Sequence, residues 1–303
     1  MSKGWAWILL ILCNLFWAGN YIVGKLMVIS VSPFWITLLR WSIALLFLIP
    51  LAYFFEKPNW TQITKYWLSL ALMGALGVVG FTLICYAALE YTTPTNAAFV
   101  EALIPAMVVV FSVLFLQEKI SFSQIIGFVL SCLGVIILLT KGDLEQVIRM
   151  EFNKGDLMML AAVLAWVFYS IIGKKVEVPP MTTTAVSSSL GVILLLPFAF
   201  FQEGSGMEWN FLTIAGILYM AFFASVASYL FWNVSVRIIG PSQSSVFLNL
   251  VPIFTVLMSL ALGDTITRSQ IAGGVFVLTG VYLTTGMLDH AIQERVKARL
   301  LKE

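Results

Sequence analysis

The sequence predicts an all-α membrane protein with ten transmembrane helices that form two inverted five-helix repeats. Of its 303 residues, 60% are hydrophobic and only 11% are charged, whereas soluble domains have about 25% charged residues. The mean hydropathy is +0.98, and about 20 consecutive apolar residues suffice to cross a bilayer. The long uncharged runs are therefore predicted to span the membrane, and motifs that recur in the same order in both halves predict the duplication.

Apolar windows bounded by charges, proline and glycine place the ten helices. Their predicted ranges are 5–29, 33–55, 66–89, 95–117, 122–140, 157–175, 181–202, 211–236, 242–262 and 268–288. The remaining hydrophilic segments, 141–156 and the tail after residue 288, are too short to bury a core of their own. The activity is therefore expected to reside within the membrane.

Lysine and arginine in the short loops predict the orientation, because cytoplasmic loops retain positive charge. With the N-terminus inside, most loop cations fall on the inner side: Lys3, Lys57, Lys65, Lys119, Lys174, Lys175, Arg237, Arg295, Lys297, Arg299 and Lys302. The outer side then holds Lys141, Arg149, Lys154 and Arg268. Both termini are predicted to be cytoplasmic, and the basic tail is predicted to lie on anionic lipid.

Two pairs of motifs indicate an internal duplication. Residues 15–25 match residues 164–174 at five of eleven positions. Residues 118–127 match residues 264–273 in the pattern acid-x-x-hydroxyl-x-x-Gln-x-x-Gly. Because each half holds five helices, an odd number, the second copy enters the membrane in the opposite sense, as in alternating-access carriers built around a midplane site. The predicted units are 1–142, 143–288 and the cytoplasmic basic tail 289–303.

Several residues together carry a family resemblance: Phe16-Trp17-x-Gly19-Asn20, Pro33, Arg40, Pro105 and the 118–127 junction. They resemble the EamA-type transporters of the drug/metabolite transporter superfamily, over all ten spans and with one EamA-like repeat in each half. The resemblance implies a bacterial inner-membrane exporter of small metabolites, often amino acids. It also implies a central cavity lined by helices one, three, four, six, eight and nine. Glu101 departs from the family pattern, which more usually has a small or apolar residue there.

Pro105 and Pro252 lie near the centres of the predicted helices four and nine. A proline removes a backbone hydrogen bond and displaces the carbonyl four residues earlier, here those of Glu101 and Leu248. Interruptions at corresponding positions of two repeats favour a substrate site or a bending gate. The alternative is a pair of static kinks, which membrane helices tolerate.

Glu101 is an acid inside an apolar helix, where a charge costs about 2.5–3.5 kcal/mol on insertion scales and is a functional candidate by default. It is predicted to carry a coupling proton or to neutralise a substrate ammonium. The alternatives are a structural ion pair with Arg40, or an exposed position if the helix boundaries are misplaced. Arg40 itself is explained as well by structure as by function, since a guanidinium near a helix start can bind loop carbonyls.

Deep aromatic and amide side chains predict a cavity that suits a neutral or zwitterionic solute. The predicted substrate-binding residues are Trp17, Asn20, Tyr86, Glu101, Trp166, Tyr169, Trp232 and Asn249. Helix packing or an interhelical hydrogen bond is the alternative for each of them singly.

Other classes of protein are disfavoured by the sequence. The single histidine, His290, lies in the tail, and the sequence has no metal-ligand spacing and no Gly-Lys-Ser/Thr phosphate loop, so no enzyme, metal or cofactor is expected. A net charge of +2 does not suggest a nucleic-acid partner. The sequence shows neither rings of charged residues nor a carbonyl filter, which disfavours a channel. The sequence predicts a secondary transporter of a small organic molecule, monomeric by preference, in contact with the lipid bilayer. Broad drug or cation efflux is the alternative.

Overall fold

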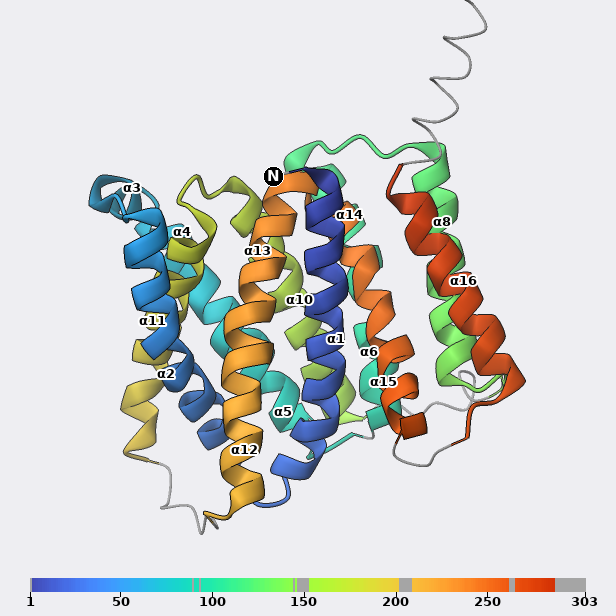
Figure 1. Cartoon of the computed structure of the whole chain (residues 1–303), viewed down its shortest axis with the longest axis horizontal. Coiled ribbons are helices and arrows are strands. Elements are labelled where there is room, and N and C mark those ends of the chain that lie inside the picture. Colours follow the sequence, from blue (N-terminus) through green and yellow to red (C-terminus); the bar gives the residue numbers. More distant parts are fainter. Residues whose placement is uncertain are drawn as a thin grey trace, which may run out of the picture.

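A computed structural model describes residues 2–88, 90–92, 94–143, 145, 153–201, 209–261 and 265–286. Figure 1 shows a bundle of helices that run in roughly the same direction, with the N-terminus at one end of the bundle. The predicted basic tail lies outside the described residues, together with Arg149, Asp264 and His290.

The first half makes five crossings. They are α1 (Lys3–Met27); α2 (Pro33–Leu51) with the π-helical η1 (Ala52–Glu56); α4 (Trp67–Gly74), η2 (Ala75–Leu83) and α5 (Ile84–Ala88); α6 (Pro94–Glu101) and α7 (Ile104–Leu116); and α8 (Phe122–Leu139). The short helix α3 (Trp60–Lys65) joins the second crossing to the third.

The second half repeats this order. Its crossings are α10 (Lys154–Lys175); α11 (Pro180–Ala199); α12 (Phe211–Tyr219), η3 (Met220–Ala227) and α13 (Ser228–Ile239); α14 (Pro241–Val246), η4 (Phe247–Asn249) and α15 (Leu250–Ala261); and α16 (Arg268–Thr284). Among the described residues, eight helical stretches are long and apolar enough to cross a membrane. The other two crossings are the interrupted α6–α7 and the 17-residue α16. The predicted fold class is therefore confirmed.

Of the helix boundaries that differ from the prediction, two have clear local causes. α10 begins at Lys154, three residues before the predicted start, because Asn153 caps it: the Asn153 side chain accepts from Asp156 N, and the Asp156 carboxylate accepts from Asn153 N. Because the first turn of α10 is polar, the hydropathy pattern does not reveal where the helix starts. α13 continues to Ile239 and ends at Gly240, whose φ of 84° is unfavourable for residues with a Cβ.

The match between residues 118–127 and 264–273 also appears as a shared cap. Ser121 begins α8 and Thr267 begins α16, and each hydroxyl accepts from the backbone of a glutamine three residues on. Each glutamine side chain bonds back to the cap residue, which makes a capping box in both repeats. The same sequence pattern therefore starts equivalent helices in the same way.

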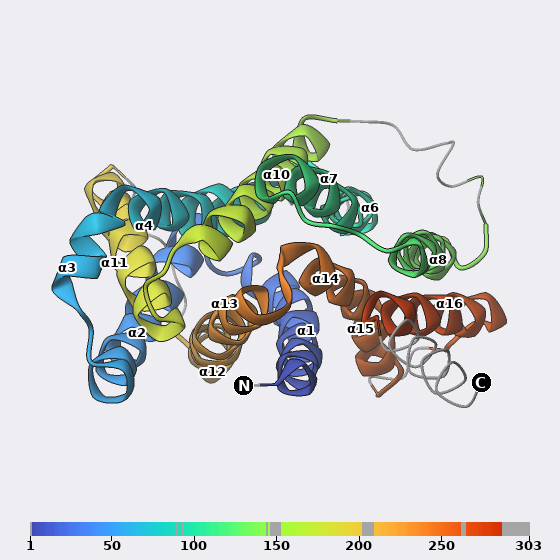
Figure 2. The ribbon, with the colours of Figure 1, turned by 90° about the horizontal axis from the view of Figure 1, so that it is seen from above.

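α8 and α16 pack along each other at one edge of the molecule, with α2, α3 and α11 at the opposite edge (Figures 1 and 2). Gly127 faces Gly280 and Gly134 faces Gly273, so residue numbers rise along one helix as they fall along the other. This antiparallel pairing is the arrangement that an inverted repeat requires. Small residues let the backbones approach where no hydrophobic force drives helices together in lipid.

Candidate functional site

The helix with a central proline is interrupted in both repeats. α6 ends at Glu101 and α7 starts at Ile104, with Pro105 in its first turn. In the second repeat, the 3-10 segment η4 separates α14 from α15, and Pro252 lies in the first turn of α15. The interruptions lie where the prolines predict them, and their action as gates stays a prediction.

Each interruption carries one polar side chain. Asn249 belongs to η4, is buried, and donates from Nδ2 to Ser131 Oγ on α8 at 2.8 Å. Glu101 is the last residue of α6 and is partly buried. Its carboxyl group accepts from the Tyr21 hydroxyl on α1 and from the Cys85 thiol on α5, with Cys85 Sγ 3.9 Å from Oε1. Glu101 is thus contacted by neutral groups from two other helices.

Arg40 lies in α2 and is buried, with 3% of its surface exposed. Its Nε donates to Ser225 Oγ at 2.8 Å, and its Nη1 donates to Tyr86 Oη at 2.9 Å and to Asn20 Oδ1 at 3.3 Å. Tyr86 also donates to Asn20 Oδ1, at 3.2 Å. We call Arg40, Asn20, Tyr86 and Ser225 the Arg40 cluster; it joins α1, α2, α5 and η3.

The structural pair between Arg40 and Glu101 is not formed. In the described part of the chain, the ion pair within 4.0 Å is that of Lys65 with Glu177, on the surface. The partners of Arg40 are neutral oxygens, not loop carbonyls or a carboxylate. Glu101 and Arg40 therefore do not neutralise each other by direct contact.

Four of the five predicted aromatic residues meet in one cluster. Trp17 packs edge-on to Trp166 with 5.2 Å between ring centroids, and Trp166 stacks on Tyr169 at 5.1 Å. Trp232 lies 5.3 Å from Trp166. Trp166, Tyr169 and Trp232 are at most 2% exposed, so their rings contact one another instead of an open space in this conformation.

Hydrogen bonds fix several of these rings. Trp17 Nε1 donates to the Ala224 carbonyl at 3.1 Å, and Trp232 Nε1 donates to Ser170 Oγ at 3.2 Å. Asn233 Nδ2 donates to Tyr169 Oη at 2.7 Å. The indole nitrogen of Trp166 is buried and has no partner among the described residues.

Tyr229 was not among the predicted site residues, yet it lies at the junction of the two clusters. Its ring contacts Trp17 and Trp166, and Trp41 packs edge-on to it at 4.6 Å. Arg40 Cζ lies 5.8 Å from the Trp41 ring centroid, so Trp41 connects the Arg40 cluster to the aromatic cluster. The available sequence signal was spacing: Tyr229 precedes Trp232 by three residues and so shares its helix face.

A cavity of about 350 Å³ lies between α7, α8, α14 and the end of α16. Its polar lining includes Lys3, Glu118, Lys119, Gln124, Gln243 and Thr284. Both glutamine side chains donate to the Thr284 carbonyl, at 3.4 Å from Gln124 and 2.5 Å from Gln243. The predicted site residues do not line this cavity, which lies at the end of the bundle that holds the N-terminus.

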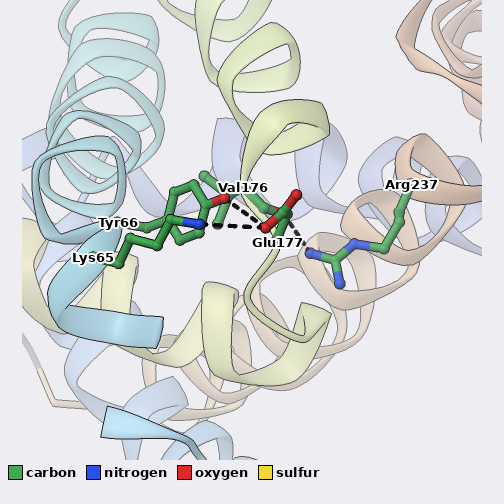
Figure 3. A network of polar contacts seen from close by, with 5 residues as sticks. All are labelled: Lys65, Tyr66, Val176, Glu177 and Arg237. Carbon is green, nitrogen blue, oxygen red and sulfur yellow. Dashed lines mark hydrogen bonds and ion pairs between the residues drawn. The ribbon is translucent and has the colours of Figure 1, made fainter. Parts of the chain in front are cut away.

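A surface network tethers the loop between α10 and α11 (Figure 3). Tyr66 Oη donates to Glu177 Oε2 at 2.7 Å, Lys65 Nζ lies 3.7 Å from the same oxygen, and Arg237 donates to the Val176 carbonyl at 2.7 Å. The Tyr66 hydrogen bond, and then the Lys65 charge, lower the pKa of the Glu177 carboxyl. This contact stabilises the fold above the ordinary carboxyl pKa and is lost as the pH falls through the lowered pKa of the folded state. The contribution of this contact to stability therefore does not change with pH near neutrality.

An inverted repeat with a broken helix in each half is the architecture of a membrane carrier, and the comparisons specify which family. The model of the EamA-like transporter family matches residues 4–140 and 153–286. The chain belongs to this family, with two EamA repeats, and is a multi-pass membrane transporter, not an enzyme.

Relatives cover nearly the whole chain. The chain is 28% identical to the uncharacterized transporter YyaM of Bacillus subtilis, over 93% of this chain and 94% of the relative. It is 28% identical to an uncharacterized transporter of Archaeoglobus fulgidus, over 92% and 96%. It is 23% identical to the WAT1-related protein At5g07050 of Arabidopsis thaliana, over 88% and 76%. One crystal structure superimposes with a TM-score of 0.78 over 94% of this chain and 98% of the other, at 18% identity, which shows a shared fold.

Proposed function

We propose that this transporter is a secondary carrier that exports small organic metabolites, amino acids in particular, in exchange for protons. The observation that carries the proposal is the pair of helix interruptions, each with a polar side chain, at corresponding positions of the inverted repeats. Broken helices expose backbone and side-chain polar groups at mid-membrane depth, where carriers of this architecture bind solutes and bend.

The surroundings of Glu101 support the coupling role. The group has a hydroxyl and a thiol as partners and no ion pair among the described residues. Its charge is therefore not committed to a structural cation, so it can take up a proton or bind a substrate ammonium. Because both events neutralise the same carboxylate, proton and solute compete for it, and this competition is the basis of exchange.

The proposal places the protein in the bacterial inner membrane as a monomer, with both termini in the cytoplasm. The loop charges support this orientation. The proposed units, 1–142 and 143–288, each contain one of the two family matches.

The solute class is tested by counterflow in proteoliposomes that contain a panel of labelled amino acids or fluorescent organic cations. We expect saturable counterflow of one or a few amino acids and no movement of the cations. Movement of the cations without any amino-acid counterflow would contradict the proposal and assign the protein to drug efflux.

Replacing Pro105 or Pro252 by alanine is expected to slow exchange at least about threefold without lowering the midpoint of thermal unfolding. Alanine restores a backbone donor and favours a continuous helix, so the bend that alternating access needs becomes harder. Initial rates of counterflow measure the effect. Pro197→Ala is the matched control, because Pro197 lies inside α11 on an exposed surface. Equal rates for all three variants and the wild type would show that the kinks are static.

A further inference from the structure

Arg40 has a hydrogen-bonding capacity that the fold does not use. Its Nε and Nη1 are bonded, whereas its Nη2 makes no hydrogen bond within the described residues. Nη2 is also absent from the fully enclosed polar atoms that lack a partner, so a small part of its surface borders accessible space. A mostly buried guanidinium thus presents one nitrogen toward that space.

Hydrogen bonds fix the position of the Arg40 side chain, but no neighbouring anion among the described residues neutralises its charge. Removing a guanidinium from water is strongly unfavourable unless an anion compensates its charge. Ser225, Tyr86 and Asn20 fix the orientation of the group through neutral oxygens, and no described carboxylate lies within 4.0 Å of it. A guanidinium held in this way can receive an anion, and the N–H groups of Nη2 remain to donate charge-assisted hydrogen bonds to a carboxylate.

The same two helices carry Arg40's partners and those of Glu101. On α1, Asn20 contacts Arg40 and the next residue, Tyr21, contacts Glu101. On α5, Tyr86 contacts Arg40 and the preceding residue, Cys85, contacts Glu101. Arg40 and Glu101 therefore both contact the same short stretch of α1 and α5, but they do not pair with each other.

We propose that Arg40 is the carboxylate anchor of the transport site. Its Nη2 donates to the carboxylate of an α-amino acid, whose ammonium group lies toward Glu101. The groups that contact the two opposite charges are neighbouring residues on α1 and neighbouring residues on α5. This short spacing matches the two charged ends of a zwitterion. This assignment rests on the proposed transport of amino acids and adds the group that recognises the carboxylate.

The wild-type protein supplies the decisive test. The common L-amino acids and their carboxamides, which keep the ammonium and lose the carboxylate, are compared as competitors of counterflow and as stabilisers in thermal unfolding in detergent. We expect at least one amino acid to compete about tenfold more strongly than its carboxamide, and to raise the unfolding midpoint as a ligand of the folded state must. The absence of any amino acid that is preferred over its carboxamide in either assay overturns the anchor.

Variants locate the preference at Arg40. Arg40→Gln is expected to remove the discrimination between acid and amide, and Arg40→Lys, which keeps the charge, to retain part of it even if the glutamine variant does not fold. Lys175→Gln is the control, since Lys175 is exposed. Preference that survives in a folded Arg40→Gln protein overturns the assignment. Amino-acid counterflow with equal competition by the amide leaves the proposed function standing and removes the anchor, whereas organic-cation transport without amino-acid counterflow removes the proposed function.

Discussion

Replacing Glu101 by glutamine is expected to retain solute exchange, at a lower affinity because the substrate ammonium loses its counter-charge, and to abolish accumulation driven by a pH gradient. Glutamine keeps the size of the side chain, and its carbonyl oxygen can still accept from Tyr21 and Cys85, the partners of the native carboxyl. The amide cannot take up and release a proton. A gradient of one pH unit supplies about 1.4 kcal/mol per proton, which corresponds to about tenfold accumulation. The accumulation ratio is therefore expected to fall from several-fold to about one.

Glu177→Gln is the matched control for this experiment. It removes a carboxylate that is exposed and tied to Tyr66 and Lys65, and the lowered pKa of Glu177 keeps it ionised near neutral pH. Its accumulation ratio and the pH dependence of its flux between about pH 6 and 8 are expected to equal those of the wild type. Accumulation that persists in Glu101→Gln would exclude Glu101 as the coupling group.

Alanine at Gly273 or Gly280 is expected to lower the free energy of unfolding by about 1–3 kcal/mol through overpacking. A Cβ at Gly273 would lie 2.8 Å from Gly134 O and 2.9 Å from Leu138 N, and one at Gly280 would lie 2.5 Å from Ser131 N. These are mainly backbone atoms of α8, which cannot move without separating the two helices. The steric cost exceeds the gain of about 0.5–1 kcal/mol that alanine brings to a helix interior.

Gly274 provides an internal control for the α8–α16 contact. It is adjacent to Gly273 on α16, but a Cβ there would meet nothing within 4 Å. Gly274→Ala is therefore expected to be neutral or slightly stabilising, as measured by the midpoint of thermal unfolding in the same detergent. Equal midpoints for the Gly273 and Gly274 variants would contradict the close backbone packing of the two repeats.

The fold could be predicted because the rules that set it are local. Length and apolarity specify a crossing, and the order of motifs specifies the repeat. The π-helical segments η1, η2 and η3 have no such signal, since they depend on how neighbouring helices pack. The early start of α10 was missed because polar capping residues, not apolar ones, determine it.

The site was less predictable, because contacts between helices decide it. The positions of Trp17, Trp166 and Trp232 within their apolar segments predicted that they lie at a similar depth in the membrane, and their rings do contact one another. Those positions could not show that the rings pack on each other, nor that Tyr229 joins them. The partners of Arg40 come from α1, α5 and η3, and no local pattern in α2 contains that information.

Proton-driven accumulation by the wild-type protein tests the central claim most directly. Proteoliposomes are loaded with a labelled amino acid at equal concentration inside and outside, and a pH gradient is then imposed while the pH of the lumen is recorded. We expect the amino acid to accumulate on the side with the higher proton concentration, as exchange requires, and the pH gradient to collapse faster when the amino acid is present. Amino-acid distribution that stays even, with a pH gradient that decays at the same rate with and without the solute, would contradict proton-coupled exchange.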